Sequence, residues 1–362
     1  MVTLKDKNIL FVGMNYASVM DTLAGAFREK GFNVKSISLE ESFSPYNNYF
    51  NTHTYFEKHK IKHGLGYRFY KIKKFFYLLK HVLWADIVHV YSRPSYKKID
   101  FYLISIFVKW KIVTFLGSEV RIPDVTKQNN KFYQDAVADP FYEYKNESFE
   151  YSSQHQMAFI KWGYKAIVWD VKNYLIKEFS KHYEIVPHAS NNYIEAAIVN
   201  KPNAAPVVMH APSAPIAKGT KYIVNAVNNL KKKGIPFKFI LVKDKNNEEY
   251  QKLLLHCDIL IDQMVWGAYG IASQQALQMG KVVICYISED NALLYGKDCP
   301  VVNANGDNLE TVLERLLLDE KERKRISQDS KAYYQKQHNP ERVVEKMVEA
   351  YKKLFQINSR GT

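Results

Sequence analysis

Two short segments in the second half of the chain carry residue types that bind an anion. The first reads His210-Ala211-Pro212-Ser213, continues to Ala217-Lys218-Gly219-Thr220, and then enters a helical pattern. The segment is expected to run from a strand end through a tight loop to a helix N-terminus. Backbone N–H groups and the positive end of the helix dipole would then face a bound anion. Lys218 adds a full charge, which suits a diphosphate. No GxxxxGKS/T sequence is present, which excludes a Walker A loop. A capped core helix with a surface lysine is the alternative interpretation.

The second segment places a glycine-containing loop between a strand and a helix. We expect the strand to end at Asp262, the loop to cover Gln263–Tyr269 and the helix to begin at Gly270. Gly267 and Gly270 allow a ligand to approach the backbone closely, and the helix N-terminus is a second anion site. Gln275 lies about one and a half turns into that helix, where it can face the ligand. A purely structural loop is the alternative.

The first half offers weaker candidates at the ends of its expected strands. Glu119 and Asp170 are carboxylates suited to the role of a side-chain base, and a turn or helix-cap role is the alternative for both. Gly13 follows the first strand without completing a GxGxxG motif, which excludes a dinucleotide site there. A satisfied core histidine is the alternative to a substrate-binding role for His89.

The elements that would position these residues alternate between strand and helix in both halves. Runs rich in β-branched residues predict strands, and helical spacing of apolar residues predicts the helices between them. This alternation predicts an α/β protein with two Rossmann-like domains, whose doubly wound parallel sheets bind ligands at the carboxyl ends of their strands. The expected strands are Asn8–Val12, Asn33–Ser38, Asp86–Tyr91, Lys111–Leu116, Lys165–Trp169, Pro206–His210, Phe237–Val242, Asp258–Asp262 and Lys281–Tyr286.

The length of 362 residues suits two domains. Three prolines and four asparagines in Pro187–Pro206 mark a linker between them. We expect a first domain over 1–187, a second over 188–338, and a C-terminal amphipathic helix over 339–362 that packs back on the first domain. Residues 124–151 are expected to form a long loop that shapes a substrate site in the cleft between the domains.

The two anion-binding segments together resemble the GT-B glycosyltransferases, in particular the retaining glycosyltransferase family 4. Lys218-Gly219-Thr220 matches the family's Lys-Gly pair and following helix. Tyr269-Gly270, Gln275-Ala276-Leu277 and Gly280-Lys281-Val282-Val283 resemble its "EGFG…EAMA.GKPV" block. Two stretches of the first half are similar to the family's "ADIVH" strand and "GSDIR" turn, namely Trp84–His89 and Gly117–Arg121. The resemblance therefore covers nearly the whole chain.

This resemblance implies a nucleotide-diphosphate sugar donor in the second domain and an acceptor in the first. Glu119 and Lys218 are the expected catalytic residues, with Lys218 on the diphosphate. The nucleotide sugar is a substrate, and no metal or other cofactor is expected. The expected acceptor-binding residues are Gly13, Asn15, His89 and Gly117. The expected donor-binding residues are Ser213, Lys218, Gly219, Thr220, Asp262, Gln263, Tyr269, Gly270, Ile271 and Gln275.

Four positions depart from the family pattern. The two family glutamates, eight positions apart, fall on Gly267 and Gln275, and the arginine before the Lys-Gly pair falls on Ser213. A histidine that precedes the Gly-Ser-Asp turn falls on Leu116. Gln275 can still hydrogen-bond hydroxyl groups but carries no charge. The resemblance implies retaining transfer in which the leaving phosphate takes the acceptor's proton and fixed positive groups stabilise it, so that no enzymic nucleophile is required.

The formal net charge of +14 indicates a negatively charged partner, either a phosphorylated substrate, an anionic membrane surface or nucleic acid. The segment Tyr55–Trp84 interleaves eight lysine and arginine residues with aromatic residues. This pattern is typical of a helix at an anionic membrane surface, and a solvated basic face is the alternative. No RNA- or DNA-binding motif accompanies it, so nucleic acid is not expected as a partner.

The remaining features narrow the functional class. Cys257, Cys285 and Cys299 show neither zinc-ligand nor disulfide spacing. The chain has no run of about 18 apolar residues and no signal-peptide pattern, which predicts a cytoplasmic protein, peripheral at the inner face of the cell membrane. We expect a glycosyltransferase of cell-surface polysaccharide or glycan biosynthesis. The alternatives are a non-catalytic homologue that binds a sugar or nucleotide, or assists an active transferase, and another GT-B enzyme such as an epimerase or phosphorylase.

Overall fold

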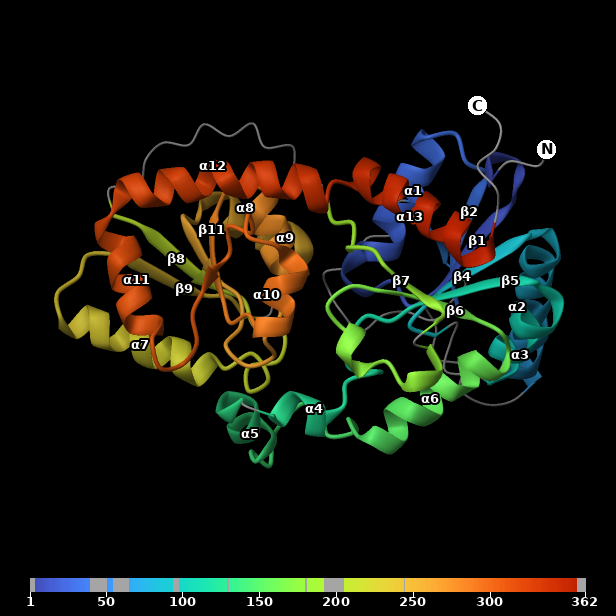
Figure 1. Cartoon of the computed structure of the whole chain (residues 1–362), viewed down its shortest axis with the longest axis horizontal. Coiled ribbons are helices and arrows are strands. Elements are labelled where there is room, and N and C mark those ends of the chain that lie inside the picture. Colours follow the sequence, from blue (N-terminus) through green and yellow to red (C-terminus); the bar gives the residue numbers. More distant parts are fainter. Residues whose placement is uncertain are drawn as a thin grey trace. The chain divides into compact units, whose positions relative to one another are not determined.

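The computed structural model describes residues 4–39, 51–54, 65–93, 98–128, 130–179, 181–191, 205–243 and 245–356. The chain forms two compact units, each of which draws on separated parts of the sequence (Figure 1). Unit 1 comprises Met1–Arg121, Ser148–Ala189 and Pro340–Thr362, and unit 2 comprises Ile122–Glu147 and Ser190–Asn339. Residues 192–204 of the expected linker lie outside the described residues.

Unit 1 is built on a seven-stranded parallel sheet in the order β3-β2-β1-β4-β5-β6-β7. Its central strands β1 and β4 are buried at every position, as expected for a parallel sheet covered on both faces. The strands are β1 (Ile9–Gly13), β2 (Val34–Ser38), β3 (His53–Thr54), β4 (Ile87–Tyr91), β5 (Trp110–Thr114), β6 (Lys165–Val168) and β7 (Tyr183–Ile185).

Alternate residues of these strands pack against two different layers of helices. Leu10 and Val12 of β1 belong to an apolar cluster with α2 (Leu65–Trp84), α3 (Lys98–Phe107) and α6 (Phe149–Lys161). Phe11 points the other way and packs edge-on against Phe27 of α1 (Val19–Glu29), with 5.4 Å between ring centroids. The two-sided burial confirms the doubly wound arrangement predicted for this half.

The C-terminal helix α13 (Pro340–Phe355) belongs to unit 1, as the sequence predicts. It packs on α1, where Tyr351 stacks on Phe27 at 6.2 Å between ring centroids (Figure 1). Val343, Val344, Met347 and Ala350 form the rest of its buried face. The apolar residues recur at helical spacing, so packing on unit 1 removes most of the stripe from water.

Unit 2 is built on a five-stranded parallel sheet in the order β12-β11-β10-β8-β9. Its strands are β8 (Val207–His210), β9 (Lys238–Leu241), β10 (Ile259–Ile261), β11 (Val282–Cys285) and β12 (Val302–Asn303). Its core joins these strands to the apolar faces of α7 and α11. The helices are α7 (Thr220–Lys232), α8 (Asn247–His256), α9 (Ile271–Gln278), α10 (Glu289–Tyr295), α11 (Leu309–Leu318) and α12 (Glu320–Gln337).

The segment 122–147 differs from its sequence-based description. The sequence predicts a long loop over 124–151 within a first domain of 1–187, whereas the structure has two short helices, α4 (Pro123–Lys127) and α5 (Lys131–Val137), whose contacts are with unit 2. The aromatic residues of this segment explain the difference. Phe132, Tyr133 and Tyr142 form an apolar cluster with Ala214, Ala217 and Val265 of unit 2.

Candidate functional site

The two predicted anion-binding segments meet at Gly219. This residue precedes α7 in the left-handed region at φ +71°, and a Cβ there would lie 3.0 Å from Cγ2 of Val265 and 3.1 Å from Cβ of Met264. Only glycine combines that backbone conformation with so close a neighbour. The backbone N–H of Met264 also donates to the carbonyl of Lys218 at 3.0 Å. The structure therefore brings together segments that are more than forty residues apart in the sequence.

Lys218 and Asp262 form a buried ion pair at this meeting point. Nζ of Lys218 lies 2.6 Å from Oδ1 of Asp262, and the side chains are 11% and 1% exposed. The other carboxylate oxygen accepts hydrogen bonds from the backbone N–H of Gly270 at 2.9 Å and from Oγ of Ser273 at 2.7 Å. Asp262 thus attaches the predicted cation to the N-terminus of α9, a relationship that the sequence did not reveal.

The pair keeps both of its charges despite burial. Burial alone would raise the pKa of Asp262, but the charge and hydrogen bond of Lys218, with the bonds from Ser273 and Gly270, outweigh it and lower that pKa. Burial likewise opposes the charge of Lys218, and Asp262 outweighs it, so the pKa of Lys218 is raised. Lys218 is therefore a fixed positive charge with further N–H donors on its ammonium group.

His210, at the end of β8, connects this region to α7. Its Nδ1 lies 2.8 Å from the carbonyl of Ile261 and its Nε2 lies 2.9 Å from Oγ1 of Thr220. A carbonyl can only accept, so Nδ1 carries the proton and Nε2 accepts from the threonine hydroxyl. Burial, the largest cause, lowers the pKa of His210 to about 4 and keeps the ring neutral. The hydroxyl of Thr220, a predicted donor-binding residue, is engaged in this contact.

Gln263 shapes the loop that follows β10. Its amide N–H2 group donates to the carbonyls of Ala268 at 2.5 Å and Tyr286 at 3.2 Å. Its amide oxygen accepts from the backbone N–H groups of Val265 and Trp266, both at 2.7 Å. All these bonds lie within unit 2, and they tie this predicted donor-binding residue to its own loop and to the chain after β11.

Gly267 stands where the resembled family has a glutamate, and the loop leaves no room for one. The residue has φ +76°, and a Cβ would lie 2.9 Å from Cβ of Ser288 and 3.2 Å from its backbone nitrogen. Any side chain would therefore combine a left-handed backbone with a steric clash. The absence of that glutamate follows from the geometry of the loop.

The remaining donor-side candidates surround the start of α9. Tyr269 is buried, and its hydroxyl lies 2.8 Å from Nε2 of His338 and 3.3 Å from the hydroxyl of Tyr333, so its ring points towards the end of α12. Gly270 caps α9, which begins at Ile271. Ile271 and Gln275 are half-buried on that helix, and Ser213 is exposed in the loop after β8.

In unit 1, two of the predicted residues shape the turn after β5. The carboxylate of Glu119 accepts hydrogen bonds from the backbone N–H of Leu116 at 2.6 Å and of Gly117 at 3.0 Å. This geometry matches the turn-carboxylate alternative raised for Glu119. The guanidinium of Arg121 lies beside Gly117, where a Cβ would be 3.4 Å from one of its terminal nitrogens.

The other predicted acceptor residues have structural contacts. A Cβ on Gly13, which has φ +146°, would lie 2.4 Å from the carbonyl oxygen of Tyr91, so glycine is needed where β1 approaches β4. Asn15 is buried and accepts from the backbone N–H of Asp21 at 3.1 Å. His89 lies 2.6 Å from both Oγ1 of Thr114 and the hydroxyl of Tyr351, and burial lowers its pKa to about 3.

A group of ionisable residues gathers where β4, β5 and β6 end. Asp170 follows β6, and burial, reinforced by the charge of Glu119 and opposed by Arg121, raises its pKa to about 6. His155 of α6 is in the same group, because Glu119 and Arg93 both act on its pKa, which burial lowers. We call Arg93, Glu119, Arg121, His155 and Asp170 the unit 1 charge cluster. Its two carboxylates are predicted from the sequence and the other members are not, although Arg93 comes only two residues after a strand end.

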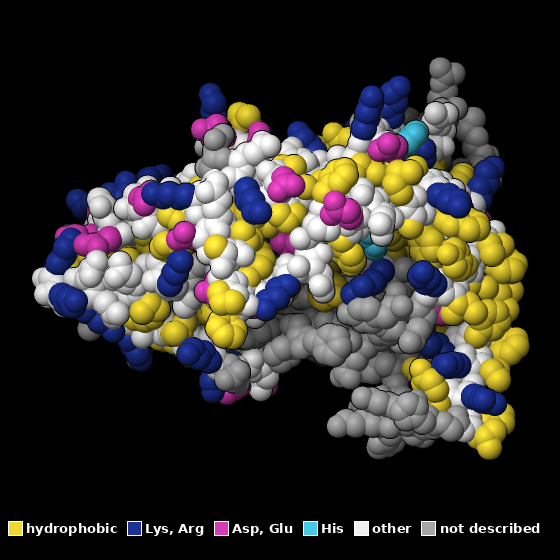
Figure 2. All heavy atoms as spheres, turned by 90° about the horizontal axis from the view of Figure 1, so that it is seen from below, with side chains coloured by type: hydrophobic (Ala, Val, Ile, Leu, Met, Phe, Trp, Pro, Cys, Tyr) yellow, Lys and Arg dark blue, Asp and Glu magenta, His cyan; other side chains and the backbone are white. Residues whose placement is uncertain are grey.

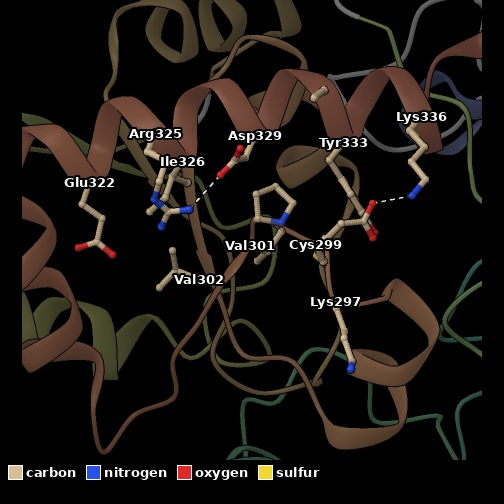
Figure 3. A pocket seen from close by; sticks show the side chains of 13 residues that line it. Lys297, Cys299, Val301, Val302, Glu322, Arg325, Ile326, Asp329, Tyr333 and Lys336 are labelled. Carbon is tan, nitrogen blue, oxygen red and sulfur yellow. Dashed lines mark hydrogen bonds and ion pairs between the residues drawn. The ribbon is translucent and has the colours of Figure 1, made fainter.

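A cavity of about 500 Å³ lies in unit 2 between α12 and the chain before β12 (Figure 3). Two of its cations face carboxylates, with Lys336 2.6 Å from Asp298 and Arg325 3.0 Å from Asp329 (Figure 3). Tyr333 lines the same cavity and donates to the carbonyl of Tyr295 at 3.1 Å. None of the predicted donor-binding residues lines it, so this cavity is distinct from the predicted donor segments.

No family model matches the chain, and no curated protein matches it. Solved structures do match along nearly its whole length. Sucrose-phosphate synthase from Thermosynechococcus elongatus is 12% identical, with a TM-score of 0.60, and the match covers 97% of this chain and 100% of that one. WaaG, a glycosyltransferase involved in lipopolysaccharide biosynthesis, is 14% identical, with a TM-score of 0.53 and coverage of 98% and 100%. Anabaena HepE in complex with UDP-glucose is 11% identical, with a TM-score of 0.51 and coverage of 97% and 100%. With its two parallel sheets, the chain therefore has the GT-B glycosyltransferase fold.

Proposed function

We propose that the protein is a glycosyltransferase that moves a sugar from a nucleotide-diphosphate sugar to a glycan, glycolipid or glycoprotein acceptor during assembly of a cell-surface glycan. The observation that carries the proposal is the convergence of the two predicted donor segments on the Lys218–Asp262 pair at the N-terminus of α9. A fixed cation beside a helix N-terminus suits a diphosphate. HepE, which has a similar fold, was solved with UDP-glucose.

The proposed chemistry depends on positioning and electrostatics. Lys218 would stabilise the negative charge that develops on the departing diphosphate, and Gln275 would hydrogen-bond donor hydroxyl groups without adding a charge. The carboxylate of Asp262 is engaged with Lys218, Gly270 and Ser273. We therefore place transfer in the retaining class that glycosyltransferase family 4 exemplifies, in which the leaving phosphate accepts the acceptor's proton. The nucleotide sugar is the substrate, and the proposal includes no further cofactor.

A ligand-induced change in thermal stability tests the donor site. UDP, GDP, CDP and dTDP sugars would each be added to the wild type, and the increase in Tm recorded relative to the same protein without ligand. At least one nucleotide sugar should raise the Tm, and Lys218→Met should abolish that increase. Lys232→Met is the matched control, because Lys232 is an exposed cation at the far end of α7, the helix that follows the Lys218 loop. If no nucleotide sugar stabilises the wild type, the donor-site proposal is wrong.

Turnover separates a transferase from a non-catalytic homologue. The nucleotide sugar that binds would be incubated with the protein and with lipid and glycan extracts of cell envelopes, and release of the nucleoside diphosphate measured. We expect release that depends on the extract. Binding with no release under any acceptor mixture would favour the alternative, an accessory or sugar-binding subunit.

The proposal also includes an anionic membrane surface as a partner at the inner face of the cell membrane. Residues 65–84 of the predicted basic segment form α2, and residues 55–64 lie outside the described residues. Leu65, Phe69, Ile72 and Phe76 recur at helical spacing and are 53–74% exposed. The neighbouring helix α3 adds exposed Ile99, Ile106 and Phe107. Hydrophobic side chains gather on the surface of unit 1 where these helices lie (Figure 2).

The charges of α2 and α3 explain why the proposed partner is anionic. Helix α2 contains Arg68, Lys71, Lys73 and Lys80 and no acidic residue. The single carboxylate of α3, Asp100, is buried 3.2 Å from Lys74. In the described part of the chain, no helix is long and apolar enough to cross a membrane. An apolar stripe flanked by cations suits a helix pair lying in the headgroup region of an anionic bilayer.

Vesicle flotation tests this partner. The wild type should float with vesicles of mixed neutral and anionic phospholipid and much less with neutral vesicles. Phe69→Ser with Phe76→Ser should abolish flotation, whereas Leu293→Ser, which removes an exposed apolar side chain of unit 2, should leave it unchanged. Equal flotation of all three proteins, or none by the wild type, would contradict a membrane-docking role for α2.

A further inference from the structure

The segment 122–147, which we call the strap, leaves unit 1 and returns to it within 26 residues. Both of its ends are held in unit 1, where Oγ of Ser152 donates to the carbonyl of Val120 at 2.7 Å. The segment itself belongs to unit 2. The strap therefore packs as part of unit 2, although the chain enters it directly from the Gly117–Arg121 turn of unit 1.

One contact of the strap is with the loop that carries Lys218. Glu143 accepts hydrogen bonds from two successive backbone N–H groups, Ile216 at 2.9 Å and Ala217 at 3.0 Å. The next three N–H groups, of residues 218–220, donate to carbonyls of residues 214–216. The carboxylate thus completes the hydrogen bonding of this turn with two charge-assisted bonds. A glutamine could not replace it, since its single oxygen would serve only one of the two N–H groups.

A second contact is with the loop that carries the Gly267–Gly270 turn. Asn130 is buried, and its side-chain N–H2 group donates to the carbonyl of Val265 at 2.8 Å. Its side-chain oxygen accepts from the backbone N–H of Tyr133 at 3.0 Å and so caps α5. One side chain therefore fixes both the strap helix and the second predicted donor loop.

Apolar packing supports both contacts. Phe132 packs edge-on against Tyr222 of α7 at 5.2 Å between ring centroids. The hydroxyl of Tyr222 in turn donates to Asp135 of the strap at 2.7 Å. The cluster that contains Phe132 and Tyr133 also includes Ala217, next to Lys218, and Val265. The strap is thus packed and hydrogen-bonded to both donor loops.

We propose that the strap is a positioning element of the donor site, in which Glu143 and Asn130 hold the two loops in the geometry that binds the nucleotide diphosphate. This inference rests on the proposed function. Neither side chain contacts the donor in this proposal; each acts on donor affinity through the loop that it holds. Because the strap is part of neither loop in the sequence, donor affinity would depend on residues 75 and 88 positions before Lys218.

The test compares donor affinity in two strap variants and one control. The nucleotide sugar that binds the wild type most tightly, from the UDP, GDP, CDP and dTDP set, would be titrated calorimetrically. Glu143→Gln should weaken binding roughly fivefold, which is the loss expected for about one net hydrogen bond. Asn130→Asp should weaken it roughly tenfold or more, because it places a carboxylate against the Val265 carbonyl. Glu150→Gln, the same charge change at an exposed position of unit 1, should leave binding unchanged.

Two further measurements distinguish positioning from a general structural role. Hydrogen exchange at the backbone N–H groups of Ile216 and Ala217 should accelerate in Glu143→Gln and not in Glu150→Gln. If turnover is found, the donor KM should rise while kcat at saturating donor stays within about twofold, because uniform binding is lost and the reacting groups are unchanged.

The outcomes separate this inference from the proposed function. If the wild type binds no nucleotide sugar, the proposed function fails and this inference fails with it. If the wild type binds and both strap variants bind equally well, only the strap inference is overturned. If Asn130→Asp does not fold, Glu143→Gln decides, because the carboxylate that it alters is partly exposed and the apolar cluster remains intact.

Discussion

Charged side chains lie at the carboxyl ends of the strands in both units, but they are arranged in different ways. In unit 2, Lys218 and Asp262 form a one-to-one pair at 2.6 Å, and both pKa values move towards the charged forms. In unit 1, Asp170 lies near a second carboxylate, Glu119, and near Arg121, and its pKa is raised to about 6. The first arrangement is a permanent dipole, whereas the second contains a group that titrates close to neutrality.

The two arrangements suit different chemical roles. A fixed ion pair stabilises charge without changing its protonation, which suits binding of a diphosphate. A carboxyl group with a pKa near the working pH suits a general base. Both oxygens of Glu119 accept backbone N–H bonds, so this carboxylate is engaged in the turn after β5.

The largest change in stability is expected when the Lys218–Asp262 ion pair of unit 2 is removed. Asp262→Leu leaves the charge of Lys218 buried without its carboxylate, and should lower the free energy of unfolding of unit 2 by about 3–5 kcal/mol. Lys218→Met combined with Asp262→Leu should recover much of that loss, because no uncompensated charge remains. Hydrogen exchange in β10 under native conditions would report unit 2 separately from unit 1. A loss below about 1 kcal/mol in the single variant would contradict a tightly coupled pair.

The next largest change in stability is expected from Asp170→Asn, and its size should depend on pH. Its pKa is raised from 3.8 to about 6, so the folded state binds this proton more tightly than the unfolded state. The resulting penalty is absent below pH 3.8, grows as the pH rises towards 6, and is complete above it. Asp170→Asn should therefore stabilise unit 1 by up to about 3 kcal/mol at pH 8, and the gain should vanish by pH 4. Thermal unfolding at several pH values measures it, and a gain independent of pH would refute the assignment.

A smaller effect tests whether unit 2 can accept another carboxylate. Gly267→Glu would restore a residue of the resembled family, but φ +76° and the contact with Ser288 should lower the free energy of unfolding by about 2 kcal/mol. Gln275→Glu, at the other glutamate position, is half-buried on α9 and should cost less than about 1 kcal/mol. Chemical denaturation compares the two, and equal stability of both variants would show that the loop can adjust.

The smallest effect compares the two buried histidines. His210 bonds to Thr220 at the start of α7, and His89 bonds to Tyr351 of α13. Thr220→Val and Tyr351→Phe each remove one hydroxyl and should each cost about 1 kcal/mol. Peptide-level hydrogen exchange should place the first loss in unit 2 and the second in unit 1. A loss spread over both units in either variant would show that these contacts are not local.

The sequence determined the elements of this protein and the place of its candidate donor site. Runs of β-branched residues, helical spacing and glycine positions predicted two parallel sheets, the amphipathic stripe of α13 and the two donor loops, because each is a local pattern. Those patterns also predicted Lys218 as the cation of the site. The donor-binding roles of Lys218, Ser213, Ile271, Gln275 and the other candidate residues remain predictions, since they depend on the bound donor.

Only the tertiary structure decided which residues those elements bring together. Asp262 is the partner of Lys218, and Glu143 is the partner of Ile216 and Ala217, across separations of 44 to 74 residues. The closeness of Ser288 leaves no room for a side chain at position 267, and Tyr351 of the C-terminal helix contacts the buried ring of His89. Periodicity records which face of an element is apolar, but not which distant segment will cover it. The strap is the clearest example. Its sequence shows that its aromatic residues need an apolar partner, but only the structure shows that this partner includes Ala217 and Val265.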